Sequence, residues 1–251
     1  MTAARRLVLA GGAAFVALAA WRSWSRGRAP EASFRPVAGM PGFRALDTAA
    51  GSVSRPSGAG AALIGLAPPE PPDPRIAADI QANPCLALYG SAPQPALAYF
   101  TDIRCPICRV QESDLADLSQ ARPDLTQVTH EYPVFGASSE FAARALVAAD
   151  PDLRPRLRVR LQRLSAVVLN AAILEGVIAG LGADPSPVLA AMDTAAVTET
   201  LARSAALARA FGFAGTPALV VGGTAVLGRI DLPTLTRIAE LETARPGPCP
   251  A

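Results

Sequence analysis

The chain has 251 residues, a length that allows one or two domains, and all 23 of its basic residues are arginine. Five of these arginines precede Glu31, the first acidic residue, so the remaining 18 stand against 21 acidic residues, a balance of about −3. This balance excludes the electrostatic footprint of a nucleic-acid-binding protein, and the hydrophobic fraction of 51%, inflated by alanine, does not indicate a membrane-embedded body.

Residues 1–28 are the first predicted segment, a signal peptide or a membrane anchor. A pair of arginines precedes an uncharged, mostly apolar run from Leu7 to Trp21, and three more arginines follow it. This run is short for a membrane span and typical of the apolar part of a signal peptide. Trp21 and Trp24 resemble interfacial anchors, which would favour retention in the membrane. We therefore expect an exported, periplasmic protein that residues 7–21 could anchor in the inner membrane.

Residues 29–78 are predicted to form a disordered linker, because proline, glycine, alanine and serine dominate this range. The prolines between Pro68 and Pro74 should hold their stretch extended. Phe34, Met40 and Phe43 lie inside the range and could form a short docking segment.

Residues 79–251 are predicted to form one α/β domain with an α-helical insertion at about 150–210. The apolar patterns and turn signals predict strands at 96–100, 125–132, 218–221 and 224–227. They predict helices at 76–82, 108–119, around Phe141 and Leu146, across 152–210 with a break at 182–185, and at 232–242. Ser138 or Ser139 is expected to cap the helix around Phe141.

Cys105 and Cys108 stand where the first predicted strand gives way to a helix. Two thiols separated by two residues can close a small ring there. The first sulfur would lie over unpaired backbone N–H groups at the helix start, where partial positive charge favours a thiolate. Pro106 fits the first helical position, because its missing N–H would be unpaired there anyway. This pattern indicates redox exchange.

The segment Gly215-Thr216-Pro217 leads into an apolar strand far from the two cysteines in the chain. A proline in front of a central strand is awkward unless it ends a loop, and a cis peptide bond is one way to set such a loop.

In Ala92-Pro93, Phe100 to Cys108, Glu131-Tyr132-Pro133 and Gly215-Thr216-Pro217, the chain resembles the DsbA-like thiol-disulfide oxidoreductases of the thioredoxin superfamily. The resemblance implies a thioredoxin-like βαβ…ββα fold with a helical insertion. It also implies that Cys105 is the exposed sulfur and Cys108 its shielded partner. Thr216 and Pro217 would face Cys105 and present backbone to an extended substrate peptide. No cofactor and no metal is implied.

Ile107 departs from the pattern of DsbA itself, which carries histidine between the proline and the second cysteine. Isoleucine donates no hydrogen bond, so we predict a reduction potential between those of DsbA and thioredoxin. An oxidase is the favoured reading. A disulfide reductase or isomerase and a copper-binding thioredoxin-like metallochaperone stay open as alternatives. The implied partners are substrate proteins with cysteine thiols and a membrane-bound or soluble protein that recycles the redox pair.

Cys85 and Cys249 lie at the two edges of the predicted domain. In an oxidising compartment they could pair as a structural disulfide that closes a long loop. Two free thiols, or an intermolecular bridge through Cys249, are the alternatives.

Three further features lead to expectations of their own. His130, the only histidine, is expected in the core or at a sheet edge, since no spacing supports a metal site. The arginines between Arg154 and Arg163 are expected to form a solvated helix face, with contact to anionic lipid or an acidic partner as the alternative. Asp102 is expected to position the turn before Cys105, and only weakly to accept a proton from Cys108.

Overall fold

The structure is a computed structural model that describes residues 33–47, 71–245 and 247–249. The predicted signal peptide or anchor, including residues 7–21, lies outside these residues. In the described part of the chain, no helix is both long enough and apolar enough to cross a membrane.

One mixed sheet organises the described residues, with the strand order β1-β2-β6-β5-β3-β4. The strands are β1 (Phe34–Pro36), β2 (Arg44–Leu46), β3 (Ala96–Thr101), β4 (Thr126–Glu131), β5 (Ala218–Val221) and β6 (Thr224–Leu227). β3 runs parallel to β4 and antiparallel to β5, which forms a hairpin with β6. The bounds predicted for β5 and β6 are confirmed, and those for β3 and β4 are correct to within one residue at each end.

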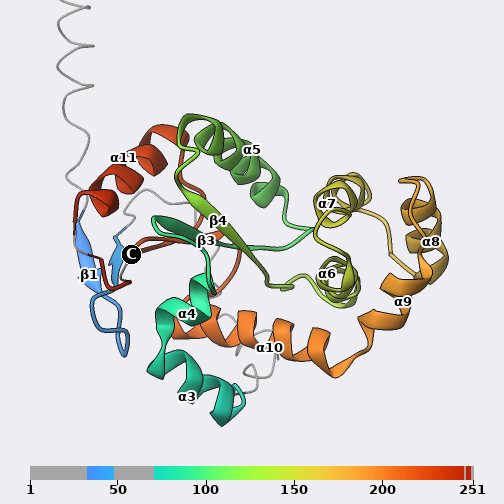
Figure 1. The fold of residues 1–251 in the computed structure, drawn as a ribbon, viewed down its shortest axis with the longest axis horizontal. Coiled ribbons are helices and arrows are strands. Elements are labelled where there is room, and N and C mark those ends of the chain that lie inside the picture. Colours follow the sequence, from blue (N-terminus) through green and yellow to red (C-terminus); the bar gives the residue numbers. More distant parts are fainter. Residues whose placement is uncertain (1–32, 48–70, 246, 250–251) are drawn as a thin grey trace, which may run out of the picture. The chain divides into compact units, whose positions relative to one another are not determined.

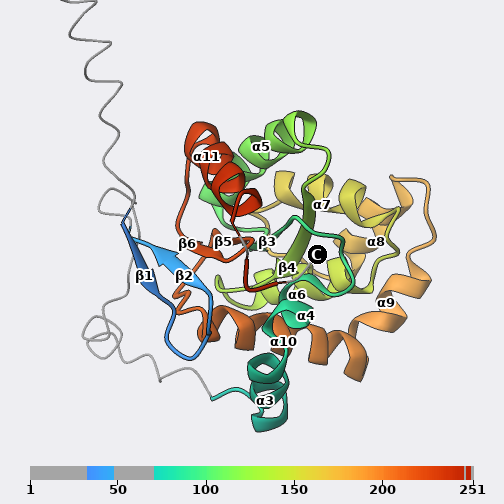
Figure 2. The same cartoon turned by 60° about the vertical axis from the view of Figure 1, so that its left-hand side comes forward.

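Helices cover both faces of this sheet (Figures 1 and 2). They are α3 (Pro74–Ala82), α4 (Pro84–Tyr89), α5 (Pro106–Ala121), α6 (Ala137–Ala148), α7 (Arg154–Arg163), α8 (Ala171–Ala179), α9 (Ser186–Met192), α10 (Ala195–Ala210) and α11 (Leu232–Thr243). β3 is buried along its whole length. Its side chains alternate: Leu97 and Tyr99 pack with α5 and α11, and Phe100 packs with α4 and α10. A continuous apolar run is what a strand covered on both faces requires.

The helices between β4 and β5 have a hydrophobic core of their own. Leu146 of α6, Leu157 and Leu161 of α7 and Ile178 of α8 are all fully buried in it. The continuous helical stretch predicted for 152–210 is divided further than expected. Asn170 and Thr194 each cap the start of a new helix with their side chains. The helical insertion is thus a set of short packed helices.

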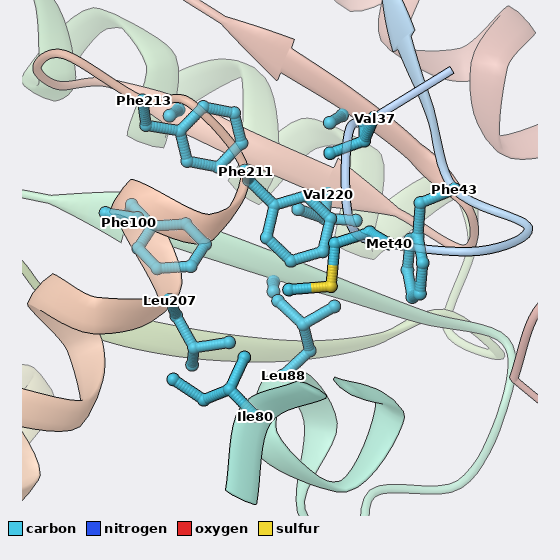
Figure 3. Close-up of a cluster of buried hydrophobic side chains, with 14 of the residues drawn as sticks. Val37, Met40, Phe43, Ile80, Leu88, Phe100, Leu207, Phe211, Phe213 and Val220 are labelled. Atoms are coloured by element: carbon cyan, nitrogen blue, oxygen red, sulfur yellow. The ribbon is translucent and has the colours of Figure 1, made fainter. Parts of the chain in front are cut away.

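A hairpin made by β1 and β2 lies inside the range predicted as a linker. β2 pairs in parallel with β6, so the hairpin extends the sheet at that edge. Met40 and Phe43, both 3% exposed, point toward Phe211 and Leu88 (Figure 3). The Phe43 and Phe211 rings meet edge to face at 5.1 Å. Burial of these apolar side chains explains why a sequence rich in proline and glycine is ordered here.

Two helices near this edge also differ from the expectations. α3 begins at Pro74, inside the predicted linker, with Asp73 capping its start. α4, which carries Cys85, was not predicted, because six residues are too few to display a helical pattern. Tyr89 at its end donates a hydrogen bond of 2.7 Å to the Gly222 carbonyl, which ties α4 to the β5–β6 turn.

Candidate active site

Cys105 and Cys108 lie at the start of α5 and are joined by a disulfide, with their Cα atoms 5.2 Å apart. Cys105 is the residue that caps the helix, and Pro106 occupies the first helical position. The Cys108 backbone N–H donates to the Cys105 sulfur at 3.1 Å. The sulfur of Cys105 therefore takes the place that a serine or aspartate oxygen fills at other helix starts, where donors and the helix dipole favour negative charge.

The Thr216–Pro217 peptide bond is cis and lies against this pair. The Cys105 sulfur is 3.6 Å from the Thr216 carbonyl oxygen. The structure therefore brings together the two segments that the sequence analysis matched to one site.

The expectation that Cys105 is exposed is wrong for this disulfide form. Cys105 is 2% exposed and Cys108 1% exposed. Packing under the Thr216 carbonyl and bonding to Cys108 leave little of the first sulfur open to solvent. Ile107, between the two cysteines, is 40% exposed, so this side chain lies at the surface beside the disulfide.

Asp102 holds the turn that precedes Cys105. One carboxylate oxygen accepts from the Arg104 N–H at 2.8 Å and from the Ser139 hydroxyl at 2.7 Å. The other accepts from the N–H groups of Val134 and Phe135 at 2.6 and 3.1 Å. These bonds join the β3–α5 turn to the segment between β4 and α6. Ser139, predicted as a helix cap, binds Asp102 instead, and the helix is capped at Gly136.

A buried ionic cluster behind the site was missed in the sequence. Arg158 of α7 contacts Glu131 at the end of β4 and lies 3.8 Å from Glu112 of α5. Gln162 donates to Glu112. Burial raises the pKa of the Glu131 carboxyl, and the nearby Arg158 guanidinium opposes this rise. The cluster connects the helical insertion to the sheet and to the helix that carries the cysteines.

Tyr99 links this part of the core to the redox pair, because its hydroxyl donates to the Cys108 carbonyl at 3.0 Å. Burial raises the pKa of Tyr99, so the phenol stays protonated as a donor. In the sequence, the ionic cluster appears only as three charged residues, Glu112, Glu131 and Arg158, that lie 19 to 46 positions apart. No local pattern reveals that they meet.

His130 and the second cysteine pair have partners other than the Cys105–Cys108 disulfide. His130 donates a hydrogen bond of 2.8 Å from Nε2 to the Leu88 carbonyl and stacks on Phe100. Cys85 and Cys249 form a disulfide with their Cα atoms 5.4 Å apart. Within the described ranges, no group of three or more His, Cys, Asp or Glu is placed to hold a metal ion.

Comparison with known proteins agrees with this fold. A family profile described as a DSBA-like thioredoxin domain matches residues 160–239, a range that does not include the Cys105–Cys108 motif. Comparison with curated protein sequences finds no match.

Three solved structures illustrate the likeness. A thioredoxin-like oxidoreductase from Silicibacter pomeroyi DSS-3 is 26% identical over 64% of this chain and 99% of its own, with a TM-score of 0.56. The catalytic domain of Proteus mirabilis ScsC is 25% identical over 67% and 99%, with a TM-score of 0.56. A periplasmic thioredoxin-like protein from Salmonella enterica serovar Typhimurium is 25% identical over 70% and 100%, with a TM-score of 0.55.

The sheet, the inserted helices and a disulfide at a helix start define a DsbA-like thioredoxin fold. The chain is similar to the DsbA-like thiol-disulfide oxidoreductases of the thioredoxin superfamily, and this likeness supports an oxidoreductase enzyme.

Proposed function

We propose that the protein is an exported oxidase that transfers the Cys105–Cys108 disulfide to the thiols of substrate proteins. The observation that carries the proposal is the position of this disulfide at the start of α5, with the Cys105 sulfur 3.6 Å from the Thr216 carbonyl. Nothing else in the described residues puts a redox-active pair next to backbone that a peptide could meet.

The exchange proceeds in two displacements. A substrate thiolate attacks Cys105, the bond between Cys105 and Cys108 breaks, and the Cys108 thiolate leaves and takes up a proton. A second substrate thiolate then attacks the substrate sulfur of the mixed disulfide and releases Cys105 as a thiolate. The substrate loses two electrons and two protons and gains a disulfide, and the enzyme becomes a dithiol. A disulfide or quinone oxidant of the recycling partner must restore it.

Stabilisation of the Cys105 thiolate drives the exchange toward oxidised substrate. The Cys108 N–H at 3.1 Å and the dipole of α5 both favour negative charge on this sulfur. A more stable reduced enzyme makes its disulfide a stronger oxidant. Ile107 adds no donor, so we expect an intermediate oxidising strength.

Thr216 and Pro217 would bind the substrate peptide. The Thr216 backbone adjoins Cys105, so an extended segment that pairs with it would bring its own cysteine to that sulfur. Backbone pairing tolerates many sequences, which suits an enzyme with many clients.

Export to the periplasm is part of the proposal, and it rests on the charged and apolar pattern of residues 1–28 and on the periplasmic relative from Salmonella. Attachment to the inner membrane through residues 7–21 would place the enzyme near a membrane-bound recycling partner.

The test is oxidative refolding of a reduced protein with several disulfides, using the wild type and Cys105→Ser. The oxidase proposal requires refolding with the wild type and its loss in the variant. Equilibration of the redox pair with glutathione measures the reduction potential in the same preparation. A potential near that of thioredoxin, together with reduction of a client disulfide and no refolding, would establish the reductase alternative instead.

A further inference from the structure

Several arginines near the redox pair form no ion pair. Most other arginines contact a carboxylate, among them Arg44, Arg122, Arg144, Arg203, Arg229 and Arg237. Within the described residues, Arg104, Arg109, Arg160 and Arg163 form no ion pair, and neither do Arg154 and Arg156 in the first half of α7. We call the first four the α7 patch. Unpaired cations gathered at one site indicate a place where a partner could supply the anions.

Hydrogen bonds place Arg104, Arg109 and the end of α7 next to the cysteines. Arg104, directly before Cys105, donates to the Val167 carbonyl at 3.0 Å. Arg109, directly after Cys108, donates to the Gln162 carbonyl at 3.4 Å. The carboxyl end of α7 therefore lies beside the start of α5. Arg163 follows Gln162, and Arg160 lies one turn earlier on the same side of the helix.

Three carboxylates of α5, β4 and the turn before Cys105 are occupied in other contacts. Glu112 is held by Gln162 and Arg158, and Glu131 is buried against Arg158. Asp102 is committed to the turn before Cys105. The positive charge of Arg160 and Arg163 is thus uncompensated where both side chains face solvent.

Apolar side chains lie among these cations. Ile107 and Val167 are each 40% exposed, and Val168 is 74% exposed. A surface that combines isolated cations with exposed aliphatic groups complements a peptide that combines carboxylates with apolar residues.

We infer that the α7 patch selects substrate segments whose cysteine is flanked by acidic and apolar residues. This inference rests on the proposed function, because a substrate that brings its sulfur to Cys105 must lay its neighbouring residues across Arg104, Arg109 and the end of α7. An anionic membrane is the less suitable occupant of the same surface, since lipid there would cover Cys105.

The test measures how fast the oxidised full-length protein oxidises three dithiol peptides that differ only in their flanks: acidic, neutral and basic. At low ionic strength we expect the acidic peptide to react roughly tenfold faster than the basic one. At about 1 M salt, where the screening length is near 3 Å, the preference should vanish. Arg160→Gln/Arg163→Gln should lower the acidic-to-basic rate ratio several-fold. Flanking charges also change the intrinsic reactivity of each peptide's thiols. Comparing the acidic-to-basic rate ratio of the wild type with that of the variant cancels this contribution, because both enzymes react with the same peptides.

Arg237→Gln is the matched control, because it removes an exposed charge on α11 and should leave the rate ratio unchanged. Equal rates for the three peptides in the wild type would overturn the inference, as would a ratio that survives the double substitution. Binding to phosphatidylglycerol vesicles that is lost in the double variant, without peptide preference, would also overturn it in favour of a membrane. Failure to oxidise any of the peptides would instead refute the proposed function.

Discussion

The Cys105 sulfur lies 3.6 Å from the Thr216 carbonyl oxygen although 111 residues separate them in the chain. Antiparallel pairing of β3 and β5 sets Phe100 opposite Ala218. The end of β3, which leads to the cysteines, therefore meets the start of β5, which follows Pro217. The register between β3 and β5 thus brings the cysteines to Thr216. Substitutions that weaken the turn before Cys105 or the packing of the sheet should therefore disturb the site.

Asp102→Asn should lower the free energy of unfolding by about 3 kcal/mol, because an amide group would face backbone donors that now bind a carboxylate oxygen. Urea unfolding of the oxidised protein measures the change. Asp124→Asn is the matched control: it removes an exposed ion pair with Arg122 and should cost under about 1 kcal/mol. Equal effects of both substitutions would contradict the role assigned to Asp102.

Arg158→Met should destabilise the protein by roughly 3–5 kcal/mol at neutral pH, because it leaves the buried Glu131 carboxyl without its counter-charge. Burial raises the pKa of Glu131 in the folded protein, so the fold favours the protonated carboxyl. The free energy of unfolding therefore decreases as the pH rises from about 4.5 toward the folded-state pKa. Arg158→Met should steepen this loss. Urea unfolding between pH 4 and 7 checks both effects, and Glu131→Gln added to Arg158→Met should restore most of the stability. A double variant as unstable as the single one would exclude this explanation.

His130 should make the protein less stable as the pH falls below 6.5. Burial lowers the pKa of His130 in the folded protein. Below pH 6.5 the unfolded chain therefore binds a proton that the folded protein does not yet bind. The stability present above pH 6.5 is lost as the pH falls toward the folded-state pKa. The loss should not exceed about 1.4 kcal/mol per pH unit. Chemical unfolding of wild type and His130→Gln at pH 7.5 and 5.5 isolates the effect, since the chain has a single histidine. Parallel pH profiles of the two proteins would disprove it.

Phe43→Ala should cost about 3 kcal/mol, because the ring is buried between Phe211 and the rest of the hairpin core. Phe34→Ala, which removes a half-buried ring under the Arg44 guanidinium, should cost about 1 kcal/mol or less. Thermal unfolding of the full chain compares them. If Phe43→Ala unfolds like the wild type, the hairpin does not contribute to the core.

Replacement of Cys85 and Cys249 by alanine should lower the free energy of unfolding by roughly 2–5 kcal/mol, because their disulfide closes a loop with a sequence separation of 164 residues. Unfolding of this double variant and the wild type, both with the redox pair oxidised, measures the difference. Mass spectrometry of the non-reduced wild type should find a peptide that joins the two positions, and its absence would show that they do not pair.

Several local features were predictable because short-range chemistry sets them. Apolar runs and glycine turns located β3, β5 and β6, and the cysteine spacing with Pro106 located the start of α5. α4 and the β1–β2 hairpin were not predictable in the same way. Both are too short to show a period, and they are ordered by burial against residues that follow them by well over a hundred positions.

By itself, the sequence determined the class of fold and predicted the thiol chemistry, since Cys105, Cys108 and the Thr216–Pro217 peptide are recognisable from local residue type and spacing. Only the tertiary structure decided that the Cys105 sulfur is shielded, that Arg158 meets Glu131 and Glu112, and that Arg104 and Arg109 lie against the end of α7. Burial and charge pairing depend on which distant segments the fold brings into contact, and no local pattern in the chain encodes that choice.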